Sequence, residues 1–137
     1  MPGPYSKPRS TPEPLYNLYM ENSAERVETA KNVWMATVRP DGRPHLVPVW
    51  FVVEAGRWYI CTAPGSVKAR NLDRNPQVAL ALEDGTNPTI VEGAAQVVSP
   101  SPAVVDKFKA KYDWDITTDT QYSLLYEVTV RRSVMGS

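Results

Sequence analysis

The chain has 137 residues, of which 42% are hydrophobic and 22% are charged, and its 15 basic residues balance its 15 acidic residues. This length and composition are typical of one globular domain that is long enough to bury a core. Because the formal net charge is zero, no overall field attracts a nucleic acid or an acidic membrane, so we expect neither as a partner and any anion site must be local.

The first part of the chain is predicted to contain an arm and then short helices. Residues 1–14 hold five of the 13 prolines and show no apolar period, so we expect an extended N-terminal arm. Residues 15–32 carry apolar side chains at helical spacing, which predicts one or two short amphipathic helices with Asn22 or Ser23 as the cap between them. Residues 15–137 are expected to form a single domain.

From residue 33 onward, short apolar runs alternate with turn residues. Asp41-Gly42 is a strong hairpin signal between the first two runs, and Asp84-Gly85 marks a later hairpin. The apolar runs predict six strands, at residues 33–38, 45–53, 57–63, 77–83, 89–99 and 122–132.

Two helices are predicted between these strands. One runs from Ser66 to about Asn75 and ends before Pro76, because the residue before a proline avoids helical backbone. The other opens at Pro102, with Ser101 as its cap. Six strands joined mostly by hairpins, with short flanking helices, predict a mainly β fold. We expect its antiparallel sheet to close into a small barrel, since closure removes exposed sheet edges.

Few residues are suited to metal binding or acid–base chemistry. The single cysteine, Cys61, excludes an internal disulfide and a cysteine-cluster metal site, and the single histidine, His45, argues against a histidine zinc site and a Ser-His-Asp hydrolase. No apolar stretch approaches the ~20 residues that cross a bilayer, and the N-terminus lacks the apolar segment of a signal peptide. We therefore expect a cytoplasmic protein without a metal.

The stretch CTAPGSVKARNLDRNP, residues 61–76, indicates a local anion site. A helix that begins near Ser66 presents unpaired backbone N–H groups and the positive end of its dipole, which favour an anion such as a phosphate. Lys68 and Arg70 lie in the first two turns, and the hydroxyl of Thr62 ends the preceding strand. A capped helix with solvated basic side chains explains the same residues, so the pattern alone leaves both interpretations open.

The run 45–53 is apolar at nearly every position, as expected for a strand covered on both faces. It contains Pro48, which removes a backbone donor and fits best at a sheet edge or an irregularity. Trp50 and Trp58 add flat aromatic surface. A planar ligand lying on this strand explains these features, and so does a core strand with Pro48 at the barrel edge.

Three stretches stand in one register over residues 27–99: WMATVRPDGRPHLVPVWF, WYICTAPGSVKARNLDRNPQVALAL and VEGAAQV. In this order and spacing they resemble the pyridoxamine 5'-phosphate oxidase-related superfamily, and most closely its small flavin- and deazaflavin-dependent reductases. The resemblance implies a split β-barrel, the FMN-binding split barrel, that forms a homodimer with two cofactor sites at the subunit interface.

The resemblance also implies where a cofactor would lie. In that family the flavin ring lies along the second strand, which carries here Val47, Pro48, Val49 and Trp50. The phosphate is held at the corner, which carries here Cys61, Thr62, Ser66, Lys68 and Arg70. Pro88 stands just before the VEG strand, which approaches the cofactor from the side. FMN is the expected cofactor, and the 8-hydroxy-5-deazaflavin coenzyme (the F-420 type) is the alternative.

The implied activity is hydride transfer between the bound ring and a small organic substrate, because such a cofactor brings its own hydride chemistry. The catalytic residues are unknown, and Tyr59, Trp114 and Tyr122 are candidates for the substrate pocket. Vitamin B6 oxidation is not implied, because Val47 and Val67 stand where the oxidases proper often carry arginine.

Two alternatives remain at this point. One is a non-catalytic module that binds FMN or the deazaflavin for cofactor storage or electron relay. The other is a haem-related or stress-response member of the same superfamily, for which His45 is the one available histidine.

Overall fold

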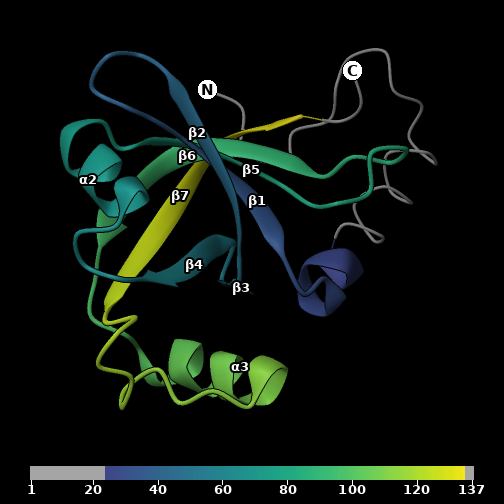
Figure 1. Cartoon of the computed structure of the whole chain (residues 1–137). Coiled ribbons are helices and arrows are strands. Elements are labelled where there is room, and N and C mark those ends of the chain that lie inside the picture. The colour runs from purple at the N-terminus through teal and green to yellow at the C-terminus, as the bar shows by residue number, and fades with distance from the viewer. Residues whose placement is uncertain (1–23, 135–137) are drawn as a thin grey trace.

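The computed structural model describes residues 24–134. The predicted arm at 1–14 and the first part of the predicted helical region, residues 15–23, lie outside the described residues. After a helical segment at 24–29, the elements shown in Figure 1 are β1 (Val33–Val38), β2 (Pro44–Val49), β3 (Val52–Glu54), β4 (Arg57–Thr62), α2 (Val67–Arg74), β5 (Gln77–Ala81), β6 (Ile90–Val97), α3 (Pro102–Tyr112) and β7 (Leu124–Val134).

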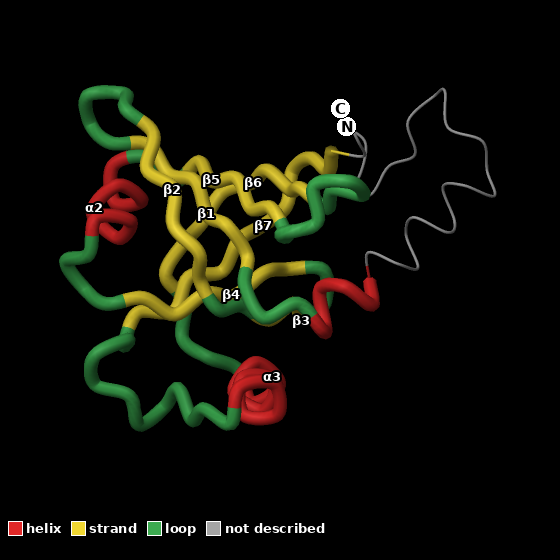
Figure 2. The backbone as a smooth tube through the Cα atoms, turned by 45° about the vertical axis from the view of Figure 1, so that its right-hand side comes forward, coloured by secondary structure: helices red, strands yellow, loops and turns green. Residues whose placement is uncertain are grey.

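The seven strands form one antiparallel sheet in the order β2-β1-β5-β6-β7-β4-β3. Its two edge strands, β2 and β3, are separated in the sequence by residues 50 and 51 alone. The sheet therefore has to curl until its edges approach each other, as the tube view shows (Figure 2). No ladder joins β2 to β3 in the described part of the chain, so the curled sheet is a half-barrel that stays open along one line.

The prediction of six strands is wrong, because the run 45–53 forms two strands. At Phe51 the backbone leaves the ladder: its N–H donates to the hydroxyl of Tyr112 at 3.0 Å, and its carbonyl accepts from the ammonium of Lys111 at 3.1 Å. Buried backbone groups need such partners, and here α3 supplies them. The chain can then cross from one sheet edge to the other. The other five predicted strands are present, with small shifts at their ends.

The predicted hairpin turns and the caps of α2 and α3 are confirmed, whereas the cap predicted at Asn22 or Ser23 lies outside the described residues. Gly42 has φ +88° in the β1–β2 hairpin, a backbone conformation that favours glycine. Ser66 caps α2 by accepting the N–H of Ala69 at 3.2 Å, and Ser101 caps α3 by accepting the N–H of Val104 at 3.3 Å. None of the described helices combines the length and the apolar character needed to cross a membrane.

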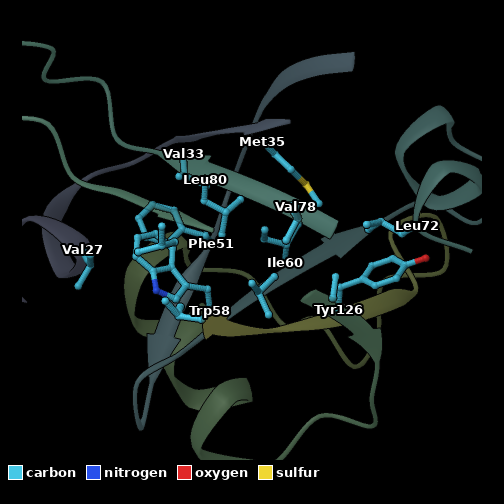
Figure 3. Close-up of a cluster of buried hydrophobic side chains, with 14 of the residues drawn as sticks. Val27, Val33, Met35, Phe51, Trp58, Ile60, Leu72, Val78, Leu80 and Tyr126 are labelled. Carbon is cyan, nitrogen blue, oxygen red and sulfur yellow. The ribbon is translucent and has the colours of Figure 1, made fainter. Parts of the chain in front are cut away.

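The main core lies inside the curl of the sheet (Figure 3). Phe51 and Trp58 are stacked there with ring centroids 5.2 Å apart, and Leu72 of α2 closes one end. A second cluster lies between α3 and the outer surface of β3, β4 and β7, with Phe108 fully buried in it. The half-barrel is therefore covered at two places, by α2 and by α3, and both helices border the open line of the sheet.

Close packing against β7 requires a glycine at position 93, in the VEG stretch. A Cβ on Gly93 would lie 2.2 Å from the carbonyl oxygen of Thr129 on β7. The register of β6 and β7 shifts between Glu92 and Gly93, as at a β-bulge. The close approach of the two strands at this irregularity excludes any side chain.

Candidate functional site

A cleft with a volume of about 440 Å³ opens where the half-barrel is split. One side is the end of β2, another is the end of β4 with the first turn of α2, and the third is the segment between α3 and β7. Its lining residues are Asn32, Pro48, Val49, Trp50, Cys61, Lys68, Trp114, Asp119 and Tyr122. Five of the ten predicted cofactor residues thus meet in one cleft: Pro48, Val49, Trp50, Cys61 and Lys68.

Lys68 is the only cation among the described residues that line the cleft. It lies in the first turn of α2, and its half-buried position lowers the pKa of its ammonium. It makes no hydrogen bond and no ion pair within residues 24–134. Burying a charge without a partner is unfavourable, so this ammonium is suited to an anion that enters the cleft.

The two hydroxyls of the predicted corner are engaged in the fold. Ser66 Oγ accepts the cap hydrogen bond of α2 and lies 3.2 Å from Thr62 Oγ1. Thr62 is only 1% exposed. These two residues shape the corner that presents Lys68 without themselves lining the cleft.

Three further predicted residues lie outside the cleft lining. Val47 is half-buried on β2, opposite Met35 of β1. Arg70 is exposed on α2. Pro88 lies in the loop between β5 and β6, which extends to the side of the molecule opposite α2 (Figure 1). A single chain therefore does not bring Pro88 to the corner.

Cys61 and His45 are poorly suited to acid–base chemistry. Burial, with a smaller contribution from the carboxylate of Asp119, raises the pKa of the Cys61 thiol to about 12, so the thiol stays protonated. Burial first, and then the charges of Arg39 and Lys68, lower the pKa of His45, which does not line the cleft. Among the described residues no group of three or more His, Cys, Asp or Glu side chains is placed to hold a metal ion.

The side of the cleft after α3 was only partly anticipated. Trp114 and Tyr122, two candidates for a substrate pocket, do line it, whereas Tyr59 lies elsewhere and donates to Glu127 of β7 at 2.8 Å. Sequence reasoning missed Asp119. Its sequence signal is a turn pattern, in which an aspartate accepts from the backbone N–H groups two and three residues later, here those of Gln121 and Tyr122.

Asp119 organises this segment. Its Oδ2 accepts the indole N–H of Trp114 at 3.0 Å, and its Oδ1 accepts the backbone N–H groups of Gln121 at 2.9 Å and Tyr122 at 2.8 Å. The Tyr122 N–H contributes most to a lowered pKa of Asp119, and the Gln121 N–H and the indole lower it further, against partial desolvation. The carboxylate is therefore charged and already bound by its own segment.

Three aromatic side chains form a continuous surface along the cleft, which we call the aromatic wall: Trp50, Trp114 and Tyr122. The ring of Trp114 meets that of Trp50 edge-on at 5.9 Å and that of Tyr122 edge-on at 6.3 Å. Trp50 is also stacked on Tyr112 of α3 at 4.4 Å. The cleft thus joins a half-buried cation on one side to flat apolar surface on the other.

The chain matches a known family over most of its length. The family model described as pyridoxamine 5'-phosphate oxidase matches residues 20–132. The chain belongs to the pyridoxamine 5'-phosphate oxidase family. The predicted superfamily is therefore confirmed. No curated protein matches the chain.

Solved structures place the half-barrel among the folds of this family. An F420 reductase is 24% identical, with 80% of this chain and 94% of that chain covered and a TM-score of 0.66. A conserved hypothetical protein from Mycobacterium tuberculosis is 27% identical, with 95% and 90% covered and a TM-score of 0.69. HutZ, the heme storage protein from Vibrio cholerae, is 22% identical, with 90% and 96% covered and a TM-score of 0.67. The fold therefore occurs both in a reductase and in a storage protein.

Proposed function

We propose that this protein binds a flavin-type cofactor in the cleft, FMN or the 8-hydroxy-5-deazaflavin coenzyme, and transfers a hydride between its ring and a small organic substrate. The observation that carries the proposal is the half-buried ammonium of Lys68, which has no partner among the described residues and shares a cleft with flat apolar surface. Family membership supports the same reading.

The phosphate of the cofactor fits the side of the cleft formed by α2. Lys68 would hold it as a charge-assisted donor, and the positive end of the α2 dipole adds to the attraction. Ser66 and Thr62 contribute by fixing the helix start, because their hydroxyls are engaged with each other and with the cap. Arg70, exposed two residues after Lys68 on α2, is the remaining candidate for a second contact with the phosphate.

The ring fits the opposite side of the cleft, along Pro48, Val49 and Trp50. When bound, a flavin or deazaflavin supplies the hydride chemistry itself. The chain then has to position the ring and exclude water, which agrees with the residues present: Cys61 keeps its proton, and the carboxylate of Asp119 is bound by three N–H donors. Val47 precedes this stretch on β2 and would shape the path by which the ring reaches it.

The proposal includes a homodimer. The outer surface of β1 and β2 exposes Trp34 at 39% and Leu46 at 60%, and Trp34 lies directly across the ladder from Pro48. Exposed large apolar side chains that gather on one sheet surface mark an interaction site. A second copy on this surface would cover them and bring partner residues near each cleft, and Pro88 is then a candidate contact to the partner's cofactor. A cytoplasmic setting belongs to the same proposal.

A non-catalytic binding module is the second candidate, and one observation favours it. Apart from Lys68 and the hydroxyl of Tyr122, the described residues lining the cleft include no group free to act as a general acid or base. Oxidation of the reduced cofactor after addition of an acceptor separates the two functions: multiple turnovers indicate an enzyme, and a stable reduced complex indicates storage or relay. We do not extend the proposal to haem, since His45 does not line the cleft.

Titration with FMN and, in parallel, with the deazaflavin coenzyme tests the proposal through ring fluorescence. In Lys68→Ala the affinity should fall about tenfold or more, the usual consequence of losing a hydrogen bond to a charged group. The matched control is Arg74→Ala, which removes the same charge from the exposed last turn of α2 and should leave the affinity within about twofold. Equal affinities in the wild type and Lys68→Ala, with the fold intact, would contradict the assignment.

A further inference from the structure

The segment 113–123 contributes one third of the cleft lining, and its role is not explained by a cofactor held at α2 and β2. The segment runs from the end of α3 back to the start of β7 (Figure 1). Its three lining residues are Trp114, Asp119 and Tyr122. None of them was assigned to the cofactor, so the cleft has a second side with its own chemistry.

This second side is held in one arrangement by Asp119. The three hydrogen bonds of its carboxylate fix both the indole edge of Trp114 and the backbone that carries Tyr122. Trp114 is held from behind as well, since its ring meets that of the fully buried Phe108 edge-on at 5.4 Å. The aromatic wall is therefore built before any ligand arrives.

The aromatic wall offers exposed ring surface, although one face of Trp50 is stacked on Tyr112 and the Lys31 ammonium lies 5.8 Å from the Trp50 ring centroid. Trp50 is 40% exposed and Tyr122 is 43% exposed, and both are among the largest exposed apolar side chains of residues 24–134. The hydroxyl of Tyr122 makes no hydrogen bond within this part of the chain. The wall thus combines flat apolar area with one free hydroxyl donor. The neighbouring carboxylate of Asp119 is already engaged in hydrogen bonds.

We propose that the aromatic wall recognises the second ligand of the cleft, a planar conjugated compound that carries a carbonyl-type oxygen. The rings of Trp114 and Tyr122 contact its apolar surface, and the Tyr122 hydroxyl donates to its oxygen. Asp119 acts as a positioning residue through Trp114 and Tyr122. This inference rests on the proposed function in one respect: the cofactor occupies Lys68 and the end of β2 up to Trp50, and it leaves Trp114 and Tyr122 for the substrate.

The direct test compares two ketones of equal size and different shape, acetophenone and cyclohexyl methyl ketone. The chain has four tryptophans, so four indole N–H signals report on binding in a ¹⁵N-labelled protein, and Trp114→Phe assigns the signal of Trp114. The titrations are run on the full chain, alone and saturated with FMN. Acetophenone should shift the Trp114 and Trp50 signals and bind about threefold or more tightly than the puckered ketone, because only a flat ring gains aromatic contacts.

Variants separate the ring, the hydroxyl and the positioning role. Tyr122→Phe should weaken acetophenone binding about threefold and leave FMN affinity unchanged, and the control Tyr59→Phe, which removes a hydroxyl outside the cleft, should leave both unchanged. Asp119→Asn should move the Trp114 indole signal, speed the exchange of its proton and weaken acetophenone binding. When Asp119→Asn is combined with Trp114→Phe in a double variant, the remaining indole signals should stay in place.

Each outcome addresses one of the two proposals. Equal binding of the two ketones, shifts confined to Trp34 or Trp58, or displacement of acetophenone by FMN would overturn the assignment of the wall to a second ligand. Loss of FMN binding in Lys68→Ala with ketone discrimination retained would support both assignments. A wild-type protein that ignores FMN and still discriminates the ketones would refute the proposed cofactor and support the wall as a site for planar carbonyl compounds.

Discussion

The two sides of the cleft are built in different ways. The α2 side is local: Thr62, Ser66 and Lys68 lie within seven residues, and the cap and the hydroxyl contact that shape it join residues three or four apart. The aromatic wall is assembled from distant parts of the chain, since Trp50 of the β2–β3 connection meets Trp114 and Tyr112. A local motif can present a cation by itself, whereas a shaped apolar wall needs a helix and a long segment to converge.

The largest expected effect comes from removing the support of the wall. Phe108→Ala deletes a fully buried ring that packs against Trp114 and Tyr112, and the cavity should lower the free energy of unfolding by about 3–5 kcal/mol. Val105→Ala, at a half-buried position of the same helix, should cost about 1 kcal/mol. Urea unfolding measures both. Equal effects would mean that the wall does not depend on this ring.

A smaller effect should appear in the pH dependence of the free energy of unfolding, through Lys111 of the same helix. Lys111 donates to the carbonyls of Val27 and Phe51 at 3.1 Å each, and burial lowers the pKa of its ammonium from 10.5 to about 8. Because the unfolded chain then binds more protons between about pH 8 and 10.5, this residue should make stability rise with pH across that window.

After discounting for solvent screening, the rise attributable to Lys111 should be about 1–2 kcal/mol. It is measured as the difference between the wild type and Lys111→Met in chemical denaturation at pH 7.5 and at pH 10.5. A difference that stays constant, or that changes in the opposite direction, would show that the ammonium is as easily protonated in the folded protein as in the unfolded chain.

The smallest expected effect comes from removing the N-terminal caps of α2 and α3. Ser66→Ala and Ser101→Ala each remove a side-chain acceptor of one backbone N–H and should lower the free energy of unfolding by about 1 kcal/mol. Only Ser66→Ala should also weaken FMN binding, because only α2 presents Lys68. A parallel loss of FMN affinity in Ser101→Ala would argue that the effect is a general loosening of the fold.

The parts of the fold that the sequence anticipated are those with local causes. Apolar runs and the turns at Gly42 and Gly85 predicted the strands, and Ser66 and Ser101 marked two helix starts. The break of the run 45–53 could not be found that way. It depends on Tyr112 and on Lys111, which lie about 60 residues further along the chain and meet Phe51 only in the folded protein.

The same distinction applies to the candidate site. Pro48, Val49, Trp50 and Lys68 were placed together by resemblance, and the structure brings them to one cleft. Asp119 was missed because its turn pattern is a common one, and the pattern does not show that the same carboxylate also binds the indole N–H of Trp114 beside the cleft. The position of Pro88 on the other side of the chain was equally hidden, since it follows from the length of the β5–β6 hairpin.

The most direct test of the central claim compares FMN with riboflavin, which has the same ring and lacks the phosphate. If Lys68 holds the phosphate, the wild type should bind FMN about tenfold or more tightly than riboflavin, and this preference should vanish in Lys68→Ala while riboflavin binding stays within about twofold. Equal affinity for the two compounds in the wild type would contradict a phosphate site at the start of α2, and a preference that survives undiminished in Lys68→Ala would contradict the assignment of the phosphate to Lys68.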